Sequence, residues 1–572
     1  MPPRRGRFEG VLGRGVLGRL TDPLFLFAVV APLLAALVTL FLVIPTLLPG
    51  VASWDTAEFQ TVGPVLGTAH PTGYPAYVIL GWIASIVFQP FGEPAYTMNL
   101  LQAVTAAAAV AGTVGIVQLL TGRRWIALAA GVMLGTSELF WRLATHADPH
   151  MFHLALVAIL FLLLLAWDRR LHSGDPDIVR HADRWLVAAA MAYGVAVANH
   201  SLALLLPPAI GLFVLAADWR VVLRWRTVVA CIGVLAATVG VFFLELPIRA
   251  AMHAPLVYGH PDTWSGFTYV VMAEQFRGSL VDPLGNLGTK AGDVFDLISG
   301  WLGPAGILAA AGLGTSLVRR PRYVLLSGLS ALAACFFAAS YENADIQRYY
   351  LVPLFVAYTW VGLGAADLVS SIVWLASRLR PSAAGDEAGE PASSTVGAAA
   401  ATDVQSRPVR WSEMVMVIAE AVVAVALLLG PLNVVSERQQ PQSDSNPGGV
   451  SEALMTSDAT WVRAMLAPAD NGGLPKNSVI VSWWSTSTTL WYGQRVLGLR
   501  PDIYIVDDRT RLDDNLGNVQ DVFNKFLGNR PVFTIRLETG VDGMAALDTE
   551  YDIQPFTLGT GVTINQVISR NR

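Results

Sequence analysis

Long apolar stretches separated by short polar segments make up most of the chain. Runs of roughly 20 apolar residues are typical of membrane-spanning helices. Eleven such runs occur, near residues 23–47, 97–119, 124–142, 150–167, 184–199, 201–217, 226–246, 299–317, 323–340, 349–376 and 413–432. The pattern therefore predicts a mainly α, polytopic membrane protein with about eleven transmembrane helices.

A twelfth apolar run, residues 74–89, is short for a span, and the basic residues decide its place. Lys and Arg are enriched on the cytoplasmic side of membrane proteins. If 74–89 lies in the outer interface, one side receives the N-terminal arginines, Arg123 and Arg124, residues 169–184, Arg220 to Arg226, Arg319 to Arg322, and Arg378 to Arg410. If it crosses, Arg123 and most later clusters fall outside. The first arrangement is favoured, with the N-terminus cytoplasmic and the C-terminus extracytoplasmic.

This topology gathers chemically capable side chains on the outer side. That side receives His70, His146, His150, His153, His200, His253, His260, Asp55, Glu58, Asp148, Arg249, Glu274 and Arg277. The predicted cytoplasmic loops are basic and otherwise plain. We therefore expect the protein to act at the outer membrane surface.

Composition agrees with a membrane location. The chain has 572 residues, and only 14% of them are charged, whereas a soluble globular chain carries about 25%. Both cysteines, Cys231 and Cys335, lie in apolar runs, so no disulfide framework is predicted. The scarcity of lysine relative to arginine and the uncleaved Arg-rich N-terminus predict a multi-pass protein of the bacterial plasma membrane.

The chain divides into five predicted parts. Residues 1–22 form a cytoplasmic N-terminus and 23–376 a transmembrane domain with a first outer loop at 48–96. Residues 377–412 are a disordered cytoplasmic linker, because 381–406 is small, polar and low in complexity. A last transmembrane helix at 413–436 leads to an extracytoplasmic domain, 437–572. There, strand patterns at 478–482, 502–508 and 531–536 alternate with helical ones, which predicts a small α/β domain with a parallel sheet.

The first outer loop contains the stretch 53-SWDTAEFQTVGPVLGTAHPTGYP-75. Asp55 and Glu58 have the spacing of a capping box, with Asp55 as N-cap, and the spacing alone favours this reading. A catalytic role remains the alternative, because a cap uses one carboxylate oxygen and leaves the other free.

Several motifs resemble the GT-C superfamily of membrane glycosyltransferases, and within it the protein O-mannosyltransferase-like family. The pattern DxxEF…HPxGYPxYxxLG in the first loop is followed by 99-NLLQAVTAAAAV-110, 141-WRLATHADPHMFHL-154, 194-GVAVANHSLALLLPP-208, 246-LPIRA-250 and 266-GFTYVVMAEQFRG-278. The chain departs from the family in two places: Ala147-Asp148-Pro149-His150 replaces Ala-Glu-x-Tyr, and 483-WWSTSTT-489 lacks the usual acidic residues.

The resemblance implies an inverting enzyme that moves a hexose, such as mannose, from a polyprenyl-phosphate carrier to an extracytoplasmic protein Ser/Thr or glycan. It assigns the catalytic base to Asp55, with Glu58 as its partner or replacement. Arginine suits phosphate oxygens, and Arg249 is the first choice for the donor phosphate, before Arg142 and Arg277. The other expected donor-site residues are His70, Tyr74, Asp148, Asn199 and His200.

Some of these residues have plainer interpretations. Asp148 is also a helix N-cap with Pro149 at the first helical position, and a metal site of Asp148, His150 and His153 is a weaker alternative, so no cofactor is predicted. Asn199 and His200 suit a tight turn, and Arg142 suits snorkelling to the interface. The segment 348-RYYLVP-353 is typical of an interfacial aromatic belt, with an acceptor groove as the alternative.

Two other functions compete with the enzyme. A lipid-linked glycan transporter would carry polar residues along its spans and internal repeats, which are not seen in the sequence. A non-catalytic assembly factor of the cell envelope would leave Asp55 dispensable. The expected partners are the lipid-linked donor and the acceptor; no nucleic acid is expected, and a dimer is left open.

Overall fold

The computed structural model describes residues 23–379, 411–535 and 547–571. The predicted N-terminus, 1–22, and most of the predicted linker, 377–412, therefore lie outside the described residues. Helix α18 (Leu351–Leu379) continues slightly past the predicted start of the linker, and α19 (Trp411–Arg438) begins just before its predicted end.

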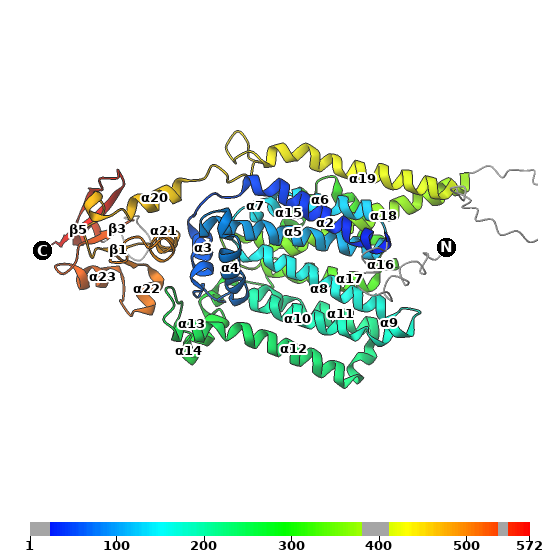
Figure 1. Cartoon of the computed structure of the whole chain (residues 1–572), viewed down its shortest axis with the longest axis horizontal. Helices are drawn as coiled ribbons and strands as arrows, with labels where there is room; N and C mark the ends of the chain where they lie inside the picture. Colours follow the sequence, from blue (N-terminus) through cyan, green and yellow to red (C-terminus); the bar gives the residue numbers. More distant parts are fainter. Residues whose placement is uncertain (1–22, 380–410, 536–546, 572) are drawn as a thin grey trace, which may run out of the picture.

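A bundle of helices forms the larger part of the molecule (Figure 1). All eleven predicted runs contain helix. The bundle consists of α2 (Pro23–Val43), α5 (Pro94–Thr121), α6 (Arg124–Thr136), α7 (Glu138–Ala144), α8 (Pro149–Leu171), α10 (Asp183–Asn199), α11 (Pro207–Asp218), α12 (Trp225–Phe243), α15 (Leu287–Leu302), α16 (Ala305–Arg319), α17 (Pro321–Ala338), α18 and α19. Shorter helices connect or flank these: α3 (Trp54–Val65), α4 (Pro75–Val87), α9 (Pro176–Arg180), α13 (Glu245–Ala251) and α14 (Trp264–Val271).

The helices support a multi-pass membrane protein, but they do not confirm a count of eleven spans. Within the described residues, seven helices are long and apolar enough to cross a membrane, or up to nine if each bent pair is one span. The bent pairs are α6 with α7, at 67°, and α15 with α16, at 114°. Helix α11 has 12 residues, so it rises only about 18 Å. Helix α4, with 13 residues, is also too short to span, as predicted for 74–89.

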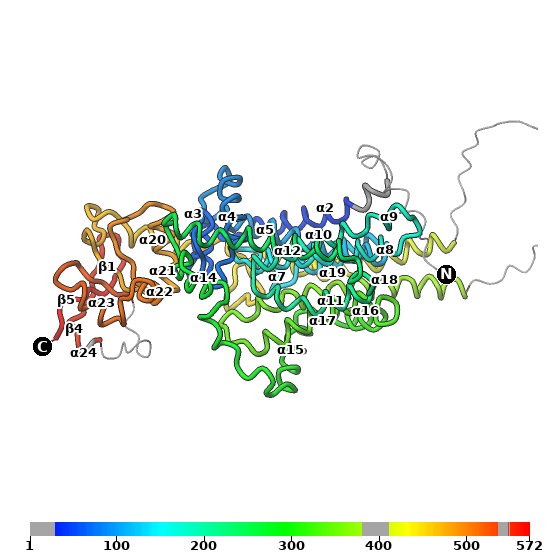
Figure 2. The backbone as a smooth tube through the Cα atoms, turned by 90° about the horizontal axis from the view of Figure 1, so that it is seen from below, coloured from blue at the N-terminus to red at the C-terminus, as the bar shows by residue number. Residues whose placement is uncertain are grey.

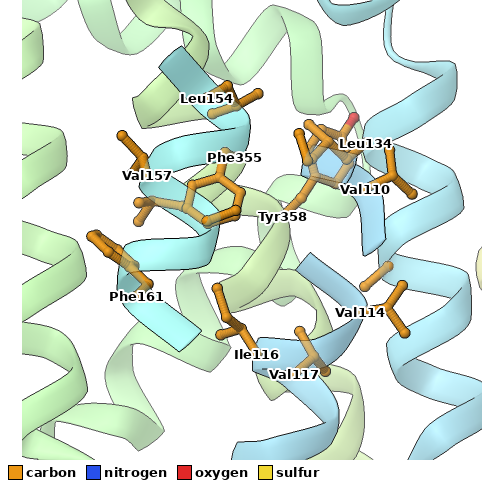
Figure 3. Packing of buried hydrophobic residues seen from close by; sticks show 14 of the residues in the cluster. Val110, Val114, Ile116, Val117, Leu134, Leu154, Val157, Phe161, Phe355 and Tyr358 are labelled. Carbon is orange, nitrogen blue, oxygen red and sulfur yellow. The ribbon is translucent and has the colours of Figure 1, made fainter. Parts of the chain in front are cut away.

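The core of the bundle is apolar and closely packed. Helix α5 packs against α2, α6 and α8, and α18 packs against α16. Val110 and Val117 of α5, Phe161 of α8 and Phe355 of α18 meet in the interior (Figure 3). Every one of these side chains is at most 1% exposed. The bundle therefore holds α8 and α18 in fixed positions, and residues at or just before the start of each helix belong to the site described below.

The C-terminal region forms a five-stranded sheet in the order β2-β1-β3-β5-β4. Strands β1 (Val479–Val481), β2 (Tyr504–Val506) and β3 (Val532–Thr534) are parallel, and they confirm the three predicted strands. Strands β4 (Tyr551–Thr557) and β5 (Thr563–Arg570) add an antiparallel pair. The expectation of a parallel sheet was therefore wrong for this half, because a hairpin connects β4 to β5 and hairpins join only antiparallel strands.

Five described α-helices accompany this sheet, and one of them joins it to the first loop. They are α20 (Ser457–Met465), α21 (Trp484–Trp491), α22 (Asp508–Asp513) and α23 (Val519–Phe526), with α24 (Leu547–Glu550) before β4. Helix α21 packs on α3. Ala57, Phe59 and Val62 of α3 share one apolar cluster with Ile480, Leu490 and Ile505 of the C-terminal region. The C-terminal region is therefore packed onto the first loop by a common core.

Both views place the sheet at one end of the bundle, beyond α3 and α4 (Figures 1 and 2). We call this the site end. The opposite end, which we call the basic end, contains Arg123, Arg320 and Arg322. Arg123 contacts Ser370 of α18, and Arg322 pairs with Asp168 near the end of α8. The basic clusters at this end agree with the one-sided distribution expected from the sequence.

Candidate active site

Helix α3 places Asp55 at the site end. The N-cap of α3 is Ser53, whose side chain makes no capping hydrogen bond, and Asp55 is the second residue of the helix. The capping-box interpretation of Asp55 and Glu58 was therefore wrong: the helix begins two residues earlier than the spacing suggested. The Asp55 carboxylate therefore has no capping role. Its side chain is 27% exposed, so it remains accessible to a substrate.

Arg348 holds the Asp55 carboxylate and also contacts Asp148. Its Nη2 atom lies 3.0 Å from Asp55 Oδ2, and its Nη1 atom lies 3.1 Å from Asp148 Oδ2. The Arg348 side chain is only 11% exposed. The segment that begins with Arg348 was expected to form an aromatic belt or an acceptor groove, so the contact of this arginine with Asp55 was not predicted. A charged residue beside a predicted span end is the only local signal that could have identified it.

A third contact reaches Asp55 from the C-terminal region. Trp484, at the start of α21, donates a hydrogen bond from Nε1 to Asp55 Oδ1 at 2.8 Å. Burial raises the pKa of Asp55, but the charges of His70 and Arg348 and the hydrogen bonds outweigh burial, so this pKa lies below its usual value. Asp55 is therefore ionised at neutral pH, with both oxygens held in place.

Glu58, His70 and Tyr74 form a second chain of contacts next to Asp55. Glu58 is fully buried and accepts a hydrogen bond from the His70 backbone N–H at 2.7 Å, and it pairs with the His70 ring. The Tyr74 hydroxyl lies 3.1 Å from His70 Nε2. Burial lowers the pKa of His70, but the neighbouring Glu58 carboxylate raises it above its usual value overall. The Glu58 carboxylate therefore favours the protonated form of the His70 imidazole beside Asp55.

The turn between α3 and α4 makes this arrangement possible. Gly73 has φ +83, and Tyr74, which precedes α4, has φ 48. A Cβ on Gly73 would approach Leu246 and Val270 at 3.0 and 3.1 Å. Only glycine adopts such a φ at no steric cost, so the turn brings the Tyr74 ring against His70, with 5.1 Å between ring centroids.

Asp148, Asn199 and His200 lie together behind Asp55. Asp148 is the N-cap of α8, as predicted, and it accepts hydrogen bonds at 2.7 Å from the backbone and the ring of His150. Asn199 donates to the Pro149 carbonyl at 3.1 Å. His200 caps the following turn by accepting from the Leu202 N–H. Its ring lies 4.6 Å from the His150 ring, so the plainer turn and capping roles are both present at the site.

The same group contains buried nitrogen atoms that have no hydrogen-bond partner. Among the described residues these are His150 Nε2, His153 Nδ1, His200 Nε2 and Arg348 Nε. The described part of the chain contains no group of three or more His, Cys, Asp or Glu side chains that could hold a metal ion. The weak metal alternative at Asp148, His150 and His153 therefore has no geometric support, and these nitrogens remain available to a polar ligand.

The three arginines predicted for the donor phosphate do not contact Asp55. Arg249 donates from Nε and Nη2 to the carbonyls of Leu66 and Val65, at 2.7 and 3.2 Å. Arg142 pairs with Glu138 at 2.8 Å. Arg277 is exposed and pairs with Glu274 at 3.3 Å. Arg249 thus holds the C-terminal end of α3, whereas Arg142 has a partner of its own within α7.

Comparisons with known proteins match the segment that contains this site. Residues 55–223 match the model of the protein O-mannosyl-transferase TMEM260 N-terminal domain. The chain is 31% identical over 127 residues to the protein O-mannosyl-transferase TMEM260 of Mus musculus, which is 22% of this chain. The match spans only 18% of the length of that relative.

Two solved structures are also similar to the chain. The structure of ArnT from Cupriavidus metallidurans bound to undecaprenyl phosphate has a TM-score of 0.49 and 14% identity, and covers 94% of this chain and 97% of that one. The structure of the same protein in the apo state has a TM-score of 0.48 and 15% identity, with the same coverage.

The matched segment begins at Asp55 and contains most of the residues that the motifs indicated. Glu58, His70, Asp148 and His200 all lie within it. Arg348 and Trp484, which complete the surroundings of Asp55, lie beyond it. Through residues 55–223, the chain is similar to the N-terminal domain of a protein O-mannosyl-transferase, in agreement with the resemblance of its sequence motifs.

Proposed function

We propose that the protein is an inverting glycosyltransferase that moves a hexose from a polyprenyl-phosphate carrier to the hydroxyl group of an extracytoplasmic acceptor. The observation that carries the proposal is the Asp55 carboxylate, which is accessible, ionised and held by Arg348 and Trp484. A carboxylate fixed in this way can act as a general base, since geometry decides first whether a group can take a proton.

In this reaction the acceptor hydroxyl attacks the anomeric carbon. Its proton passes to Asp55, the new carbon–oxygen bond forms, and the bond from the anomeric carbon to the phosphate oxygen breaks. A carboxylate of low pKa accepts the proton only late, when the hydroxyl oxygen has become acidic through bond formation. The phosphate leaves with its electron pair, so the enzyme needs a cation close to it.

Arg348 and His70 are the basic side chains that act on Asp55. Arg348 keeps one donor, Nε, without a partner among the described residues, and arginine binds phosphate oxygens well. Glu58 raises the pKa of His70 and so favours its charged form. We therefore extend the predicted donor site of Tyr74, Asp148, Asn199 and His200 to include Arg348, while Arg249 acts through the end of α3.

The sugar and the acceptor are narrower parts of the proposal. The names of the matched domain and of the murine relative, both protein O-mannosyl-transferases, favour mannose and a protein Ser or Thr. The extracytoplasmic side is favoured by the basic residues at the opposite end of the bundle.

The decisive experiment replaces Asp55 with Asn in the purified protein. Since Asp55 is not the N-cap, Asn keeps the shape of the residue and an oxygen for Trp484 but cannot take a proton. Transfer from a polyprenyl-phosphate-mannose donor should fall by roughly 10²–10⁴. Product formation is followed by mass spectrometry, and thermal unfolding of each variant shows whether the fold is retained.

Two further variants make the result specific. Glu138→Gln, which changes an acidic residue paired with Arg142, should retain transfer. Glu58→Gln tests the runner-up: a loss as large as that of Asp55→Asn would assign a share of the base role to Glu58. A stable Asp55→Asn protein with full transfer activity would reject the proposal.

A further inference from the structure

A cavity of about 390 Å³ lies between the C-terminal sheet and the loop that follows α13. One wall consists of Pro255, Leu256, Val257 and His260 of this loop. The other wall consists of residues of β2, of α22 and of the segment after α21. His260 Nε2 contacts the Asp513 carbonyl at 3.1 Å, and Arg509 donates to the Val257 carbonyl, so the two walls are joined.

The edge of the sheet lines this cavity. Strand β2 is an outer strand of the sheet, and the consecutive residues from Pro501 to Ile505 all contribute to the cavity. The Tyr504 N–H bonds to the Ser478 carbonyl, and the Val506 carbonyl accepts from the Ser482 N–H. Both residues thus face β1. Since successive backbone groups alternate along a strand, Ile505 directs its N–H and C=O to the free edge.

Two of the arginines that line the cavity are candidates for ligand binding. Arg509 is only 5% exposed, and its Nη1 atom is buried with no partner among the described residues. Arg495 is exposed and lines the same cavity. The aspartates of the cavity are already engaged, Asp502 by Arg500, Asp513 by Arg509 and Asp514 by the Tyr504 hydroxyl. A buried donor without a partner costs free energy, so the cavity suits a ligand that brings carbonyl or carboxylate oxygens.

The cavity is close to the candidate active site. Trp491 lines it, and its ring centroid lies 5.9 Å from that of Trp484. Trp484 in turn donates its hydrogen bond to Asp55. Arg509 stacks on Tyr258 at 4.1 Å, and the Tyr258 ring lies 6.3 Å from Trp484. Ring contacts and one hydrogen bond, through Trp491 and Trp484, therefore link the cavity to the Asp55 carboxylate.

From these observations we infer that the cavity binds the acceptor as an extended polypeptide, which adds a strand to the free edge of β2 and presents a Ser or Thr hydroxyl to Asp55. This rests on the proposed function and names its acceptor site. Strand addition supplies affinity from main-chain hydrogen bonds and tolerates many side chains. Arg509 and Arg495 bind carbonyl or acidic groups of the same segment.

The test uses the full-length protein, a polyprenyl-phosphate-mannose donor and a degenerate library of nonapeptides with a central Thr. Arg495→Glu should raise the KM for the peptides about tenfold or more, with a smaller change in kcat. Because Arg495 is exposed, the variant is expected to fold. Lys525→Glu, an equal charge change at an exposed residue outside the cavity, is the matched control and should leave the KM unchanged.

A second arm leaves the protein unaltered and changes the peptide. Two versions of the library are made. One is N-methylated at the odd-numbered backbone amides counted from the central Thr, and the other at the even-numbered amides. With Thr fixed at Asp55, only one set of amides faces β2, so methylation of that set should reduce transfer about tenfold or more, whereas the other set should retain it. Equal transfer by both sets, or transfer to sugar glycosides but not to peptides, would overturn the inference.

Asp55→Asn separates this inference from the proposed function. If Asp55→Asn abolishes transfer but Arg495→Glu leaves the peptide KM unchanged, the reaction stands and the acceptor site is wrong. If Asp55→Asn retains full transfer, the proposed function itself fails.

Discussion

The two ends of the helical bundle use arginine and carboxylate in opposite proportions. At the basic end, Asp367 of α18 accepts hydrogen bonds from Arg319, Arg320 and Thr315, at distances of 2.7 to 3.1 Å. At the site end, Arg348 precedes α18 and serves two carboxylates, Asp55 and Asp148. Helix α18 joins the two clusters. Its first residue, Leu351, lies about 24 Å from Asp367 along the helix axis, at 1.5 Å per residue.

This difference separates a structural ion pair from a candidate site. Both Asp367 oxygens accept hydrogen bonds from Arg319, Arg320 or Thr315, so this carboxylate is fully engaged. The site end instead keeps Arg348 Nε and His150 Nε2 buried without partners among the described residues. Buried polar groups are usually satisfied, and those that are not indicate where a ligand would bind.

Loss of an arginine should affect the two ends very differently. Arg348→Met removes the common partner of Asp55 and Asp148. Asp55 keeps Trp484 and Asp148 keeps His150, so the loss should lie at the low end of the range for a broken buried ion pair, about 3 kcal/mol in the free energy of unfolding. Arg319→Met should cost about 1 kcal/mol or less, because the residue is half exposed and Arg320 still holds Asp367. Thermal or denaturant unfolding in detergent measures both. Equal losses would mean that the two ends do not differ in this way.

Arg249→Ala tests whether an arginine of the site end acts on the donor directly. If Arg249 contacts the phosphate, the donor affinity should fall by about 1.5–3 kcal/mol, as expected for a charge-assisted hydrogen bond. Titration with polyprenyl phosphate measures this affinity. Arg249→Gln is the control: Gln can still donate to the carbonyls of Leu66 and Val65, so normal affinity in this variant would show that Arg249 acts through α3 alone.

At the basic end, Asp367→Asn should destabilise the protein without affecting transfer. The substitution leaves Arg319 and Arg320 facing one another without a countercharge, at a cost of about 1–2 kcal/mol. The readouts are the unfolding midpoint and the rate of sugar transfer. A stable Asp367→Asn protein that has lost transfer activity would indicate that the two ends are coupled through α18.

A pH dependence at the junction of the bundle and the C-terminal region should give the smallest effect. His146 lies 3.0 Å from Glu452. Burial lowers the pKa of His146, but Glu452 raises it, to about 9 overall. Since this pKa exceeds the ordinary value of about 6.5, the contact stabilises the fold fully below about pH 6.5 and loses this effect as the pH rises through 9.

His146→Gln provides the comparison for that pH effect. The wild-type protein should exceed this variant in stability at pH 6 by only about 1 kcal/mol, because Gln can still donate a hydrogen bond to Glu452, and the difference should vanish near pH 10. Unfolding midpoints at the two pH values measure it. A difference that grows with pH would contradict the assigned pairing.

The sequence predicted some parts of the candidate site and not others. Asp55, Glu58, His70 and Tyr74 lie within one short stretch, so their motif could be read directly, and the structure brings them together. Asp148 was identified as an N-cap from the proline that follows it, which the structure confirms. The capping role of Asp55 was wrong because the chain begins α3 at Trp54, and Trp54 itself has φ 60, which no local pattern indicates.

What the sequence by itself determined is the succession of apolar helices, the basic end and the motif around Asp55. These are local properties, set by the length of apolar runs and by residues close together in the chain. Only the tertiary structure decided which partners hold Asp55. Arg348 is 293 residues away and Trp484 is 429 residues away in sequence. Such contacts depend on how the bundle and the C-terminal sheet pack through their shared core, and one sequence contains no local trace of that packing.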